Sequence, residues 1–498
     1  MSKAALAAAA PIVKRTIRPR QQDESSTLNN DPMPIPTRTP AAPARSEAPL
    51  GLPVPQRYWA VATIALALIM SVLDGTIVSV ALPAIAAELG VSAAQSVWVV
   101  NAYQLAIMVS LLPLASLGDI FGYRLVYLAG LLVFTIASLI CATTDSLSTL
   151  VAARVLQGVG AAGVMSVNTA LVRFIYPPRQ LGRGIGINTL IVATSASLGP
   201  TVAAGILAVA DWPWLFAINV PFGLIALLIG LRALPHTPRS PHRFDIAGAV
   251  LNMFTFGLII ISIDGIGHGE APQWIAAQLL VAVLLGTILI RRELSRKAPL
   301  LPVDLLRIPI FALSIGTSVC SFTGQMLAFV SLPFFLQTVL GRGQVETGLL
   351  MTPWPLAVAV IAPIAGRLAD RYPAGLLGAI GLSLFASGLA LLGTLPDRPS
   401  DFDIVWRMAL CGFGFGLFQS PNNRTIISSA PRARSGGASG MLSTARLLGQ
   451  TSGAALAALI FNLLTDHGSA TALLIAAAFA IVAAGVSLVR VKTPLPRH

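Results

Sequence analysis

Charged residues are scarce in this chain of 498 amino acids. Asp, Glu, Lys and Arg together make up 11% of it, whereas soluble domains contain about 25%. Hydrophobic residues make up 55%, and the mean hydropathy is +0.78. Water is therefore not the main solvent of this chain, because so few charges cannot cover a water-facing surface.

Cysteine and the common catalytic motifs are also scarce. Cys141, Cys320 and Cys411 all lie in apolar segments, so the sequence predicts no disulfide framework. There is no HExxH motif, no Walker loop and no cluster of Cys and His. These absences argue against an intramembrane enzyme and against ATP-driven transport, and we predict neither a metal nor a cofactor.

Long apolar runs are what the sequence does contain. A bilayer core of about 30 Å requires about 20 apolar residues in a helix. The sequence supplies fourteen such runs, which predicts an all-α integral membrane protein. They lie near residues 58–86, 96–117, 123–142, 150–175, 184–209, 214–234, 246–263, 274–290, 310–340, 348–368, 375–395, 404–427, 438–464 and 471–489.

The distribution of Lys and Arg predicts the orientation. With the N-terminus in the cytoplasm, most of the 33 basic residues fall in cytoplasmic segments, and the outer loops contain only Arg342 and Arg398. An even number of spans with both termini cytoplasmic follows. The net charge of +13 is thus explained by topology, and we predict no nucleic-acid interface, because the basic residues are dispersed over many loops.

The ends of the chain differ from its centre. The first 57 residues are rich in Ala, Pro, Ser and Thr and lack an apolar stripe, which predicts a disordered cytoplasmic tail, with Met33 as an alternative start. The expected organisation is a tail at 1–57, a six-helix half at 58–234, two inserted helices with linkers at 235–307, a second six-helix half at 308–490 and a tail at 491–498.

A short phrase occurs twice in the sequence. "ASLGDIFGYR" contains Asp119 and "GRLADRYPAG" contains Asp370, each four residues after a small residue. "ARVLQGVG" and "WRMALCGFGFG" then place Arg154 and Arg407 near the outer start of the second span after each Asp loop. Two six-span halves separated by two inserted spans explain this register.

Five motifs can be compared with known families: "LDGTIVSVALPAI" (73–85), "ASLGDIFGYR" (115–124), "RVLQGVGAA" (154–162), "LGPTVAAGIL" (198–207) and "WPWLFAINVPFG" (212–223). Together they resemble the major facilitator superfamily, in its fourteen-span drug:proton antiporter branch, and the resemblance covers about residues 58–489. It implies a proton-coupled antiporter that exports lipophilic, cationic drugs or biocides across the plasma membrane by alternating access.

Asp74 and Arg154 are the candidate proton-coupling residues. An ionised side chain inside a span costs at least about 2.5 kcal/mol on insertion scales, so it usually faces a cavity or a partner. Both residues belong to the outer half of the bilayer, where an ion pair is feasible, and opening such a site can move its proton equilibrium. The alternative is that the two residues only fix the packing of helices.

Three further groups of residues have predicted roles. Gly199 and Pro200 form the antiporter motif, which kinks and packs a helix closely, although Ala203 and Ala204 replace its paired glycines; small-residue packing alone is the alternative. The gating loops, for which ordinary loop capping is the alternative, contain Asp119, Gly122, Arg124, Gly366, Asp370 and Arg371. The predicted substrate cavity contains Asn101, Tyr103, Gln104, Gln157 and Asn168.

The second half contains two other intramembrane arginines, Arg407 and Arg446, for which we expect structural hydrogen bonds to carbonyl groups. "SPNNR" at 420–424 fits either a cavity wall or a helix cap and turn. Asp264 and Glu346 lie near outer ends of spans, where solvated carboxylates are common.

The sequence leaves the substrate open. A small amphipathic compound and protons are the expected partners in the bilayer, and a metabolite exporter or uniporter on the same fold is the main alternative to drug antiport. A transporter-like sensor is a remote alternative, since only the 57-residue tail is available as an output domain. We expect a monomer, because each chain holds both halves of the cavity, and a membrane-fusion partner is left open.

Overall fold

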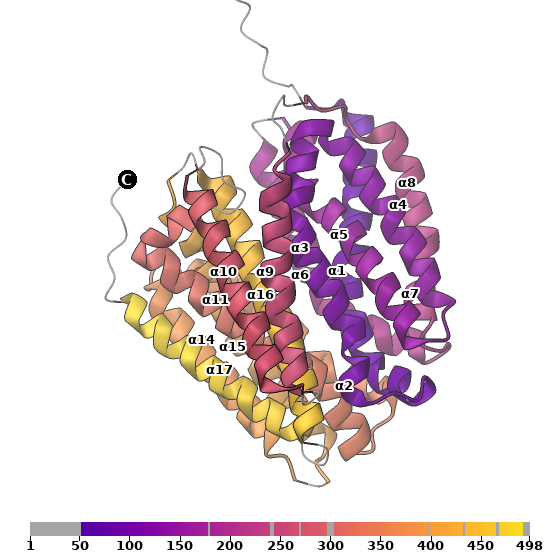
Figure 1. Cartoon of the computed structure of the whole chain (residues 1–498), viewed down its shortest axis with the longest axis vertical. Coiled ribbons are helices and arrows are strands. Elements are labelled where there is room, and N and C mark those ends of the chain that lie inside the picture. The colour runs from indigo at the N-terminus through magenta and orange to yellow at the C-terminus, as the bar shows by residue number, and fades with distance from the viewer. Residues whose placement is uncertain are drawn as a thin grey trace, which may run out of the picture. The chain divides into compact units, whose positions relative to one another are not determined.

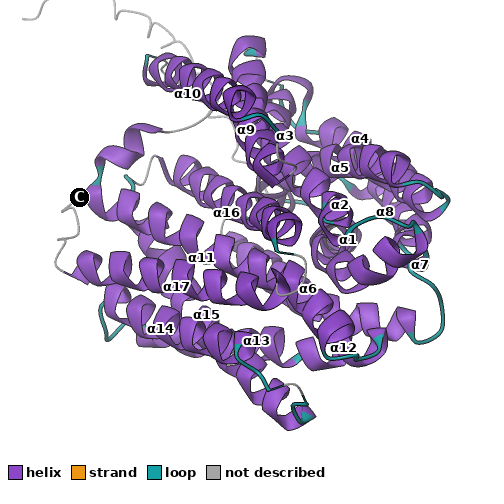
Figure 2. Ribbon diagram, turned by 60° about the horizontal axis from the view of Figure 1, so that its bottom comes forward, coloured by secondary structure: helices purple, strands orange, loops and turns teal. Residues whose placement is uncertain are grey.

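The computed structural model describes residues 51–177, 180–239, 244–267, 270–295, 303–396, 398–431, 434–464 and 468–491. Helices are the regular secondary structure found in these ranges, as Figure 2 shows. This all-helical fold confirms the predicted class, because in lipid each apolar segment must satisfy its own backbone hydrogen bonds. Most of the predicted tails, at 1–50 and 492–498, lies outside the described residues.

The first half of the bundle consists of six long helical segments, two of which contain a short break. Asn219, the first residue of the longer part of the last segment, belongs to the site described below. The segments are α1 (Val54–Glu88), α2 (Ala93–Ser96) with α3 (Trp98–Phe121), α4 (Tyr123–Ala142), α5 (Leu147–Ile175), α6 (Leu181–Leu207), and α7 (Trp214–Ala217) with α8 (Asn219–Ala233).

Two helices and then six further segments follow. The inserted helices are α9 (Ile246–Gly267) and α10 (Pro272–Leu294). After the short helix η2 (Val303–Arg307), the second half contains α11 (Pro309–Phe334) with η3 (Phe335–Val339), α12 (Gln344–Met351) with α13 (Pro353–Leu368), α14 (Ala374–Gly393), α15 (Asp401–Ser429), α16 (Ser435–Leu463) and α17 (Gly468–Val491).

Eleven helical segments of the described chain are long and apolar enough to cross a membrane. The other three long helices, α6, α15 and α16, contain 27, 29 and 29 residues but carry more polar groups. The length of each segment agrees with the apolar runs of the sequence to within a few residues. Because eleven segments meet the criteria of length and hydropathy, the total of fourteen spans with cytoplasmic termini remains a prediction.

The internal duplication is visible in close contacts between helices that glycine residues permit in each half. A Cβ built on Gly158 of α5 would lie 2.6 Å from the carbonyl oxygen of Tyr103 in α3. A Cβ built on Gly412 of α15 would lie 2.0 Å from the carbonyl oxygen of Trp354 in α13. Only glycine permits such an approach of two backbones, so both halves use the same device at the same place.

A second pair of contacts repeats in the same way. A Cβ on Gly160 would lie 2.4 Å from the backbone nitrogen of Phe134 in α4. A Cβ on Gly414 would lie 2.4 Å from the backbone nitrogen of Phe385 in α14. Each glycine stands two residues after the one described above, so the two halves can be aligned residue by residue along α5 and α15.

The inserted helices lie beside the junction of the halves. In Figure 1, α9 runs next to α3 and α16, and Asn252 of α9 donates a hydrogen bond to the Val109 carbonyl of α3 at 3.2 Å. Helix α10 packs against α9, and on its own surface Leu280 is 71% exposed and Val283 is 66% exposed. Apolar side chains this exposed suit a lipid-facing surface.

Candidate transport site

The central feature of the first half is a buried ion pair. Arg154 Nη1 of α5 forms a salt bridge with Asp74 Oδ2 of α1, and both side chains are 0% exposed. The sequence predicts this pairing from the positions of the two residues along their helices. The fold brings them together in the interior of the helix bundle.

Further hydrogen bonds hold both partners of the ion pair. The second carboxylate oxygen of Asp74, Oδ1, accepts from Gln157 Nε2 and from Asn219 Nδ2, each at 2.9 Å. Arg154 donates from Nε to the Val99 carbonyl at 2.8 Å and from Nη1 to Gln157 Oε1 at 2.6 Å. Four segments, α1, α3, α5 and α8, therefore position one carboxylate.

Aromatic rings enclose the guanidinium group. Arg154 Cζ lies 4.1 Å from the centroid of the Tyr103 ring and 5.5 Å from that of Phe216. The Tyr103 hydroxyl donates to the Ser71 carbonyl at 2.7 Å, which fixes the ring. Arg154 Nη2 is buried without a hydrogen-bond partner among the described residues. The ring faces offset part of the cost of burying the cation.

This arrangement has a specific chemical capacity. The fully buried Asp74 carboxylate bonds to one cation and two amide donors, and a proton on it would remove its attraction for Arg154. The cost of burying two charges is recovered only while both are present and bonded.

Two members of this cluster are not among the residues that the sequence singled out. Asn219 lies in the motif "WPWLFAINVPFG", so its amide could have been proposed from that motif. In the structure, Asn219 is the first residue of α8. Ser138 of α4 accepts from Gln157 Nε2 at 2.9 Å. A single serine in an apolar helix gives no comparable signal.

The predicted cavity residues separate into two groups. Tyr103 and Gln157 belong to the cluster around the ion pair. Asn101 and Gln104 are buried on α3, and Asn168 of α5 donates to Asn188 Oδ1 of α6 at 2.9 Å. The side-chain oxygens of Asn101 and Asn168 are buried and have no hydrogen-bond partner among the described residues.

Gly199 and Pro200 lie where α6 meets both halves of the bundle. A Cβ on Gly199 would lie 2.1 Å from Thr76 Oγ1 of α1, two residues after Asp74. A Cβ on Gly348 of α12 would lie 2.8 Å from the Pro200 carbonyl oxygen. The motif therefore contacts the helix of the buried acid on one side and the second half on the other.

The first Asp loop is a tight turn between α3 and α4. Gly122 has φ +96°, a conformation that L side chains rarely adopt. The Tyr123 hydroxyl donates to Asp119 Oδ1 at 2.6 Å, and the Tyr123 N–H donates to Thr237 Oγ1 at 2.8 Å. Arg124 contacts the ring nitrogens of His236 at 2.8 and 3.0 Å.

The second Asp loop makes an ion pair instead. Arg424 Nη1 of α15 bonds to Asp370 Oδ1, although both side chains are more than half exposed. A Cβ on Gly366 would lie 3.4 Å from Ser420 Oγ of the same helix α15. Arg371 is exposed, and its N–H donates to the Leu368 carbonyl at 3.0 Å. The two Asp loops therefore differ in the partner of the Asp side chain, which is the Tyr123 hydroxyl for Asp119 and Arg424 for Asp370.

The sequence-based alignment matches Arg154 with Arg407, but in the structure the residue equivalent to Arg154 is Met408, one position later. Arg154 precedes Gly158 by four residues, and four residues before the equivalent Gly412 the chain has Met408. Met408 is 0% exposed, as Arg154 is, whereas Arg407 keeps 14% of its side chain exposed. One residue turns a helical side chain by about 100°. The second half therefore carries an apolar residue at this position.

The other polar groups of the second half differ in how well they were predicted. Arg407 Nη1 donates to the Leu391 carbonyl at 3.2 Å, which is the expected kind of bond. Arg446 has its Nε buried without a partner among the described residues, and the side chain of Asp264 is outside them. The cap and turn at 420–424 is wrong, because α15 continues through Pro421 to Ser429.

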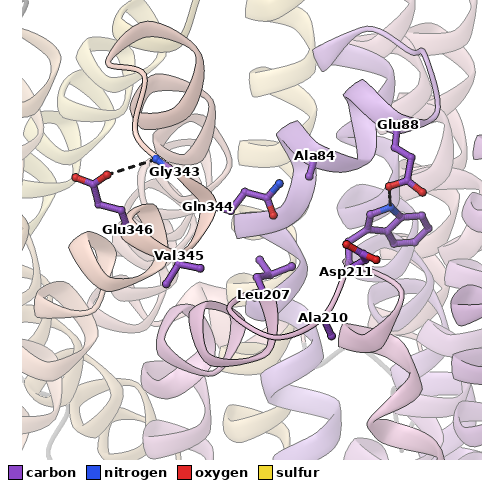
Figure 3. Close-up of a pocket in the computed structure, with 10 residues that line it drawn as sticks. Ala84, Glu88, Leu207, Ala210, Asp211, Gly343, Gln344, Val345 and Glu346 are labelled. Carbon is purple, nitrogen blue, oxygen red and sulfur yellow. Dashed lines mark hydrogen bonds between the residues drawn. The ribbon is translucent and has the colours of Figure 1, made fainter.

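A cavity of about 520 Å³ lies at the end of the bundle that the charge pattern predicts to be extracellular (Figure 3). It is lined by the end of α1, the end of α6 and the start of α12. Three carboxylates, Glu88, Asp211 and Glu346, line it. Glu88 Oε2 accepts from Trp212 Nε1 at 2.8 Å, and Glu346 pairs with Arg342.

Two similar helical halves in an apolar bundle, with a buried ion pair between helices, define a membrane transporter of the two-halved helical class. Residues 64–454 match the model of the Major Facilitator Superfamily, and the chain belongs to this family. It is therefore a multi-pass plasma-membrane transporter and not an enzyme.

Several proteins are similar over most of this chain. An uncharacterized transporter, YebQ of Escherichia coli (strain K12), is 60% identical and covers 90% of this chain and 98% of its own length. The riboflavin transporter RibZ of Clostridioides difficile (strain 630) is 31% identical, covering 79% of this chain and 86% of its own. The multidrug efflux pump LfrA of Mycolicibacterium smegmatis (strain ATCC 700084 / mc(2)155) is 30% identical, covering 82% of each.

A solved structure supports the fold. The crystal structure of a bacterial homolog to the human lysosomal transporter Spinster, in an inward-facing and unoccupied conformation, matches with a TM-score of 0.65. The match covers 89% of this chain and 98% of that one at 16% sequence identity. Similarity at this identity shows the shared fold alone.

Proposed function

We propose that this transporter is a proton-coupled antiporter that exports lipophilic cations by alternating access. The observation that carries the proposal is the ion pair of Asp74 and Arg154, which places a protonatable carboxylate in the apolar interior. A carboxylate used only for packing could be replaced by a neutral pair at lower desolvation cost. The presence of an ionisable pair here, with two amide donors on the carboxylate, favours a role in which the charge of Asp74 changes.

The coupling follows from the bonds of Asp74. When a proton binds the carboxylate, its attraction for the guanidinium disappears, while Arg154 keeps its bonds to Val99 and Gln157. The contact between α1 and α5 then weakens, and the equilibrium between conformations shifts. A cationic substrate and a proton would compete for one negative charge, which is the basis of exchange.

Helix α6 is the proposed outer gate. Thr201 Oγ1 lies 2.8 Å from Thr352 Oγ1 at the start of α13, and Gln337 of η3 donates to the Val80 carbonyl of α1 at 3.0 Å. These contacts join the two halves through α1 and α6, two of the helices that also line the cavity of Figure 3. Because Gly199 lies close to Asp74 along the same interface, a change at the ion pair can reach the gate through α1.

The proposed substrate contacts are the buried oxygens of Asn101 and Asn168, together with Gln104. Polar groups without partners in an apolar wall can bind an amphipathic cation, and aromatic rings add attraction for its charge. Tyr103 and Gln157 would act on substrate only indirectly, since the Tyr103 hydroxyl donates to the Ser71 carbonyl and the Gln157 amide bonds to the ion pair.

A neutral metabolite is the second candidate substrate. One relative is a riboflavin transporter at 31% identity, a value similar to that of the multidrug efflux pump. Export of one specific metabolite, with or without protons, would use the same fold. The two candidate functions therefore differ in the compound that is exported and in the use of protons, and share the same fold.

The test is proton movement in proteoliposomes. Wild-type protein is reconstituted, a proton gradient is imposed, and the internal pH is followed after addition of ethidium or, in a parallel sample, riboflavin. We expect ethidium to trigger proton flux that scales with the amount of protein. Flux with neither compound would contradict drug antiport, and flux with riboflavin alone would support the metabolite exporter.

The gating proposal makes a separate prediction. Asp370→Asn should change the free energy of unfolding by about 1 kcal/mol or less, because the pair with Arg424 is exposed. It should nevertheless change the transport rate several-fold if the pair holds the loop in one state. The measurements are thermal unfolding and initial transport rate.

The control for this prediction is the exchanged pair, Asp370→Arg with Arg424→Asp. It restores the attraction between α15 and the loop and should return the rate toward wild type. Asp119→Asn tests the other loop, where the partner is the Tyr123 hydroxyl. Wild-type rates for both single variants would leave loop capping as the role of these residues.

A further inference from the structure

A second buried arginine lies at the opposite end of the bundle from the cavity of Figure 3, in the last turn of α17. Arg490 is 3% exposed. Its Nη1 donates to Asn422 Oδ1 of α15 at 2.6 Å, but its Nε and Nη2 have no hydrogen-bond partner among the described residues. A buried cation with two free donors is costly unless an anion is bound there.

The neighbouring amide is fixed in a way that favours this cation. Asn422 Nδ2 donates to Ser318 Oγ of α11 at 2.8 Å, so its oxygen points toward Arg490. The arginine is thereby held in one place without its charge being neutralised. Asp370, in the loop before α14, is already bonded to Arg424.

Arg490 lines a cavity of about 210 Å³. Its other walls are the first turns of α11 and α14 and the side chain of Thr425, and no Asp or Glu is among the described residues that line it. In α14 the first bonds within the helix are donated by Leu376 and Leu377, to the Pro373 carbonyl. The N–H groups of Ala374 and Gly375 precede them in the first turn, where N–H groups have no acceptor within the helix and can bind an anion.

We propose that this cavity binds a phosphate group, with the Arg490 guanidinium and the N–H groups at the start of α14 as its donors. A phosphate offers several acceptor oxygens, which suits a guanidinium fork beside a helix N-terminus. The phosphate can belong to a phospholipid or to a soluble compound. Leu488 and Val491, on either side of Arg490, are 53% and 45% exposed apolar residues, which favours the lipid.

The test measures binding to the purified, delipidated full chain in phosphate-free buffer. The ligands are dioleoyl phosphatidylglycerol, inorganic phosphate and, as a lipid without phosphate, dioleoylglycerol, and the readout is the rise in the melting temperature with concentration. We expect phosphatidylglycerol to stabilise wild type and Arg490→Gln to bind it about tenfold more weakly. The matched control is Arg239→Gln, which removes an exposed positive charge elsewhere and should behave as wild type.

Thr425→Asp provides the second variant, in case Arg490→Gln does not fold. The new carboxylate would neutralise Arg490 from within, so this variant should be stable without ligand and lose the response. A response to phosphatidylglycerol alone identifies a lipid site, and a response to inorganic phosphate, with or without the lipid, identifies a site open to soluble phosphates. No response of wild type to either, an equal response to dioleoylglycerol, or full responses in the Arg490 or Thr425 variant would overturn the proposal.

Discussion

Asp74→Asn is expected to abolish substrate-triggered proton flux in the proteoliposome assay. The amide has nearly the shape of the carboxylate and can still bond to neighbouring groups, but it cannot take up a proton. It also leaves Arg154 buried without a counter-charge, which costs about 3–5 kcal/mol when one partner of a buried pair is removed. The measurements are proton flux and the free energy of unfolding.

Because the single variant changes coupling and stability together, its control must separate them. Asp74→Asn with Arg154→Met removes both charges and introduces the residue that the second half carries at the equivalent position, Met408. We expect most of the lost stability to return in this double variant while proton flux stays absent. Recovery of wild-type flux along with stability would show that the pair serves only helix packing.

Gly199→Ala is expected to produce the second largest effect. The added methyl group would lie 2.1 Å from Thr76 Oγ1 and 2.7 Å from Thr76 Cβ, so α1 and α6 would have to separate. Overpacking of this kind costs about 1–3 kcal/mol. The displacement occurs beside Asp74 and at the contact between the halves, so we expect loss of transport as well as a lower melting temperature.

Two variants test the cause of this effect. Gly205→Ala on the same helix adds a methyl group to a position with no atom within 4 Å and should behave as wild type. Thr76→Gly combined with Gly199→Ala removes the side chain that blocks the methyl group and should recover part of the activity. Normal transport in Gly199→Ala alone would exclude a close contact of α1 and α6 as part of the transport cycle.

The helices and their bounds were largely predictable from the sequence. Hydropathy fixes which segments lie in lipid, and the structure begins and ends most helices within a few residues of the apolar runs. The break between α7 and α8 and the passage of α15 through Pro421 were not predictable. Helix breaks and continuations of this kind depend on whether neighbouring helices satisfy the freed backbone groups.

The charged residues of the site were predictable because each is an ionisable residue within an apolar span. Asp74 and Arg154 are conspicuous because ionised groups inside spans are expensive. Asn219 and Ser138 are not, since amides and hydroxyl groups are common in helices and become part of a site only through their neighbours. The register of Arg407 was misjudged by one residue because spacing along the chain does not account for differences in loop length between the halves.

Three properties of this chain could be predicted without a structure: that it crosses the membrane, that it consists of two related halves, and that the first half carries one acid and one arginine inside its spans. Each of these properties is local, because it depends on the hydropathy, charge or repetition of a single segment. The packing of the helices shows that Gln157 and Asn219 share the carboxylate of Asp74 and that Gly199 lies against Thr76. It also shows that two donors of Arg490 have no partner among the described residues. Such contacts join residues far apart in the chain, and they are set by how closely whole helices approach each other.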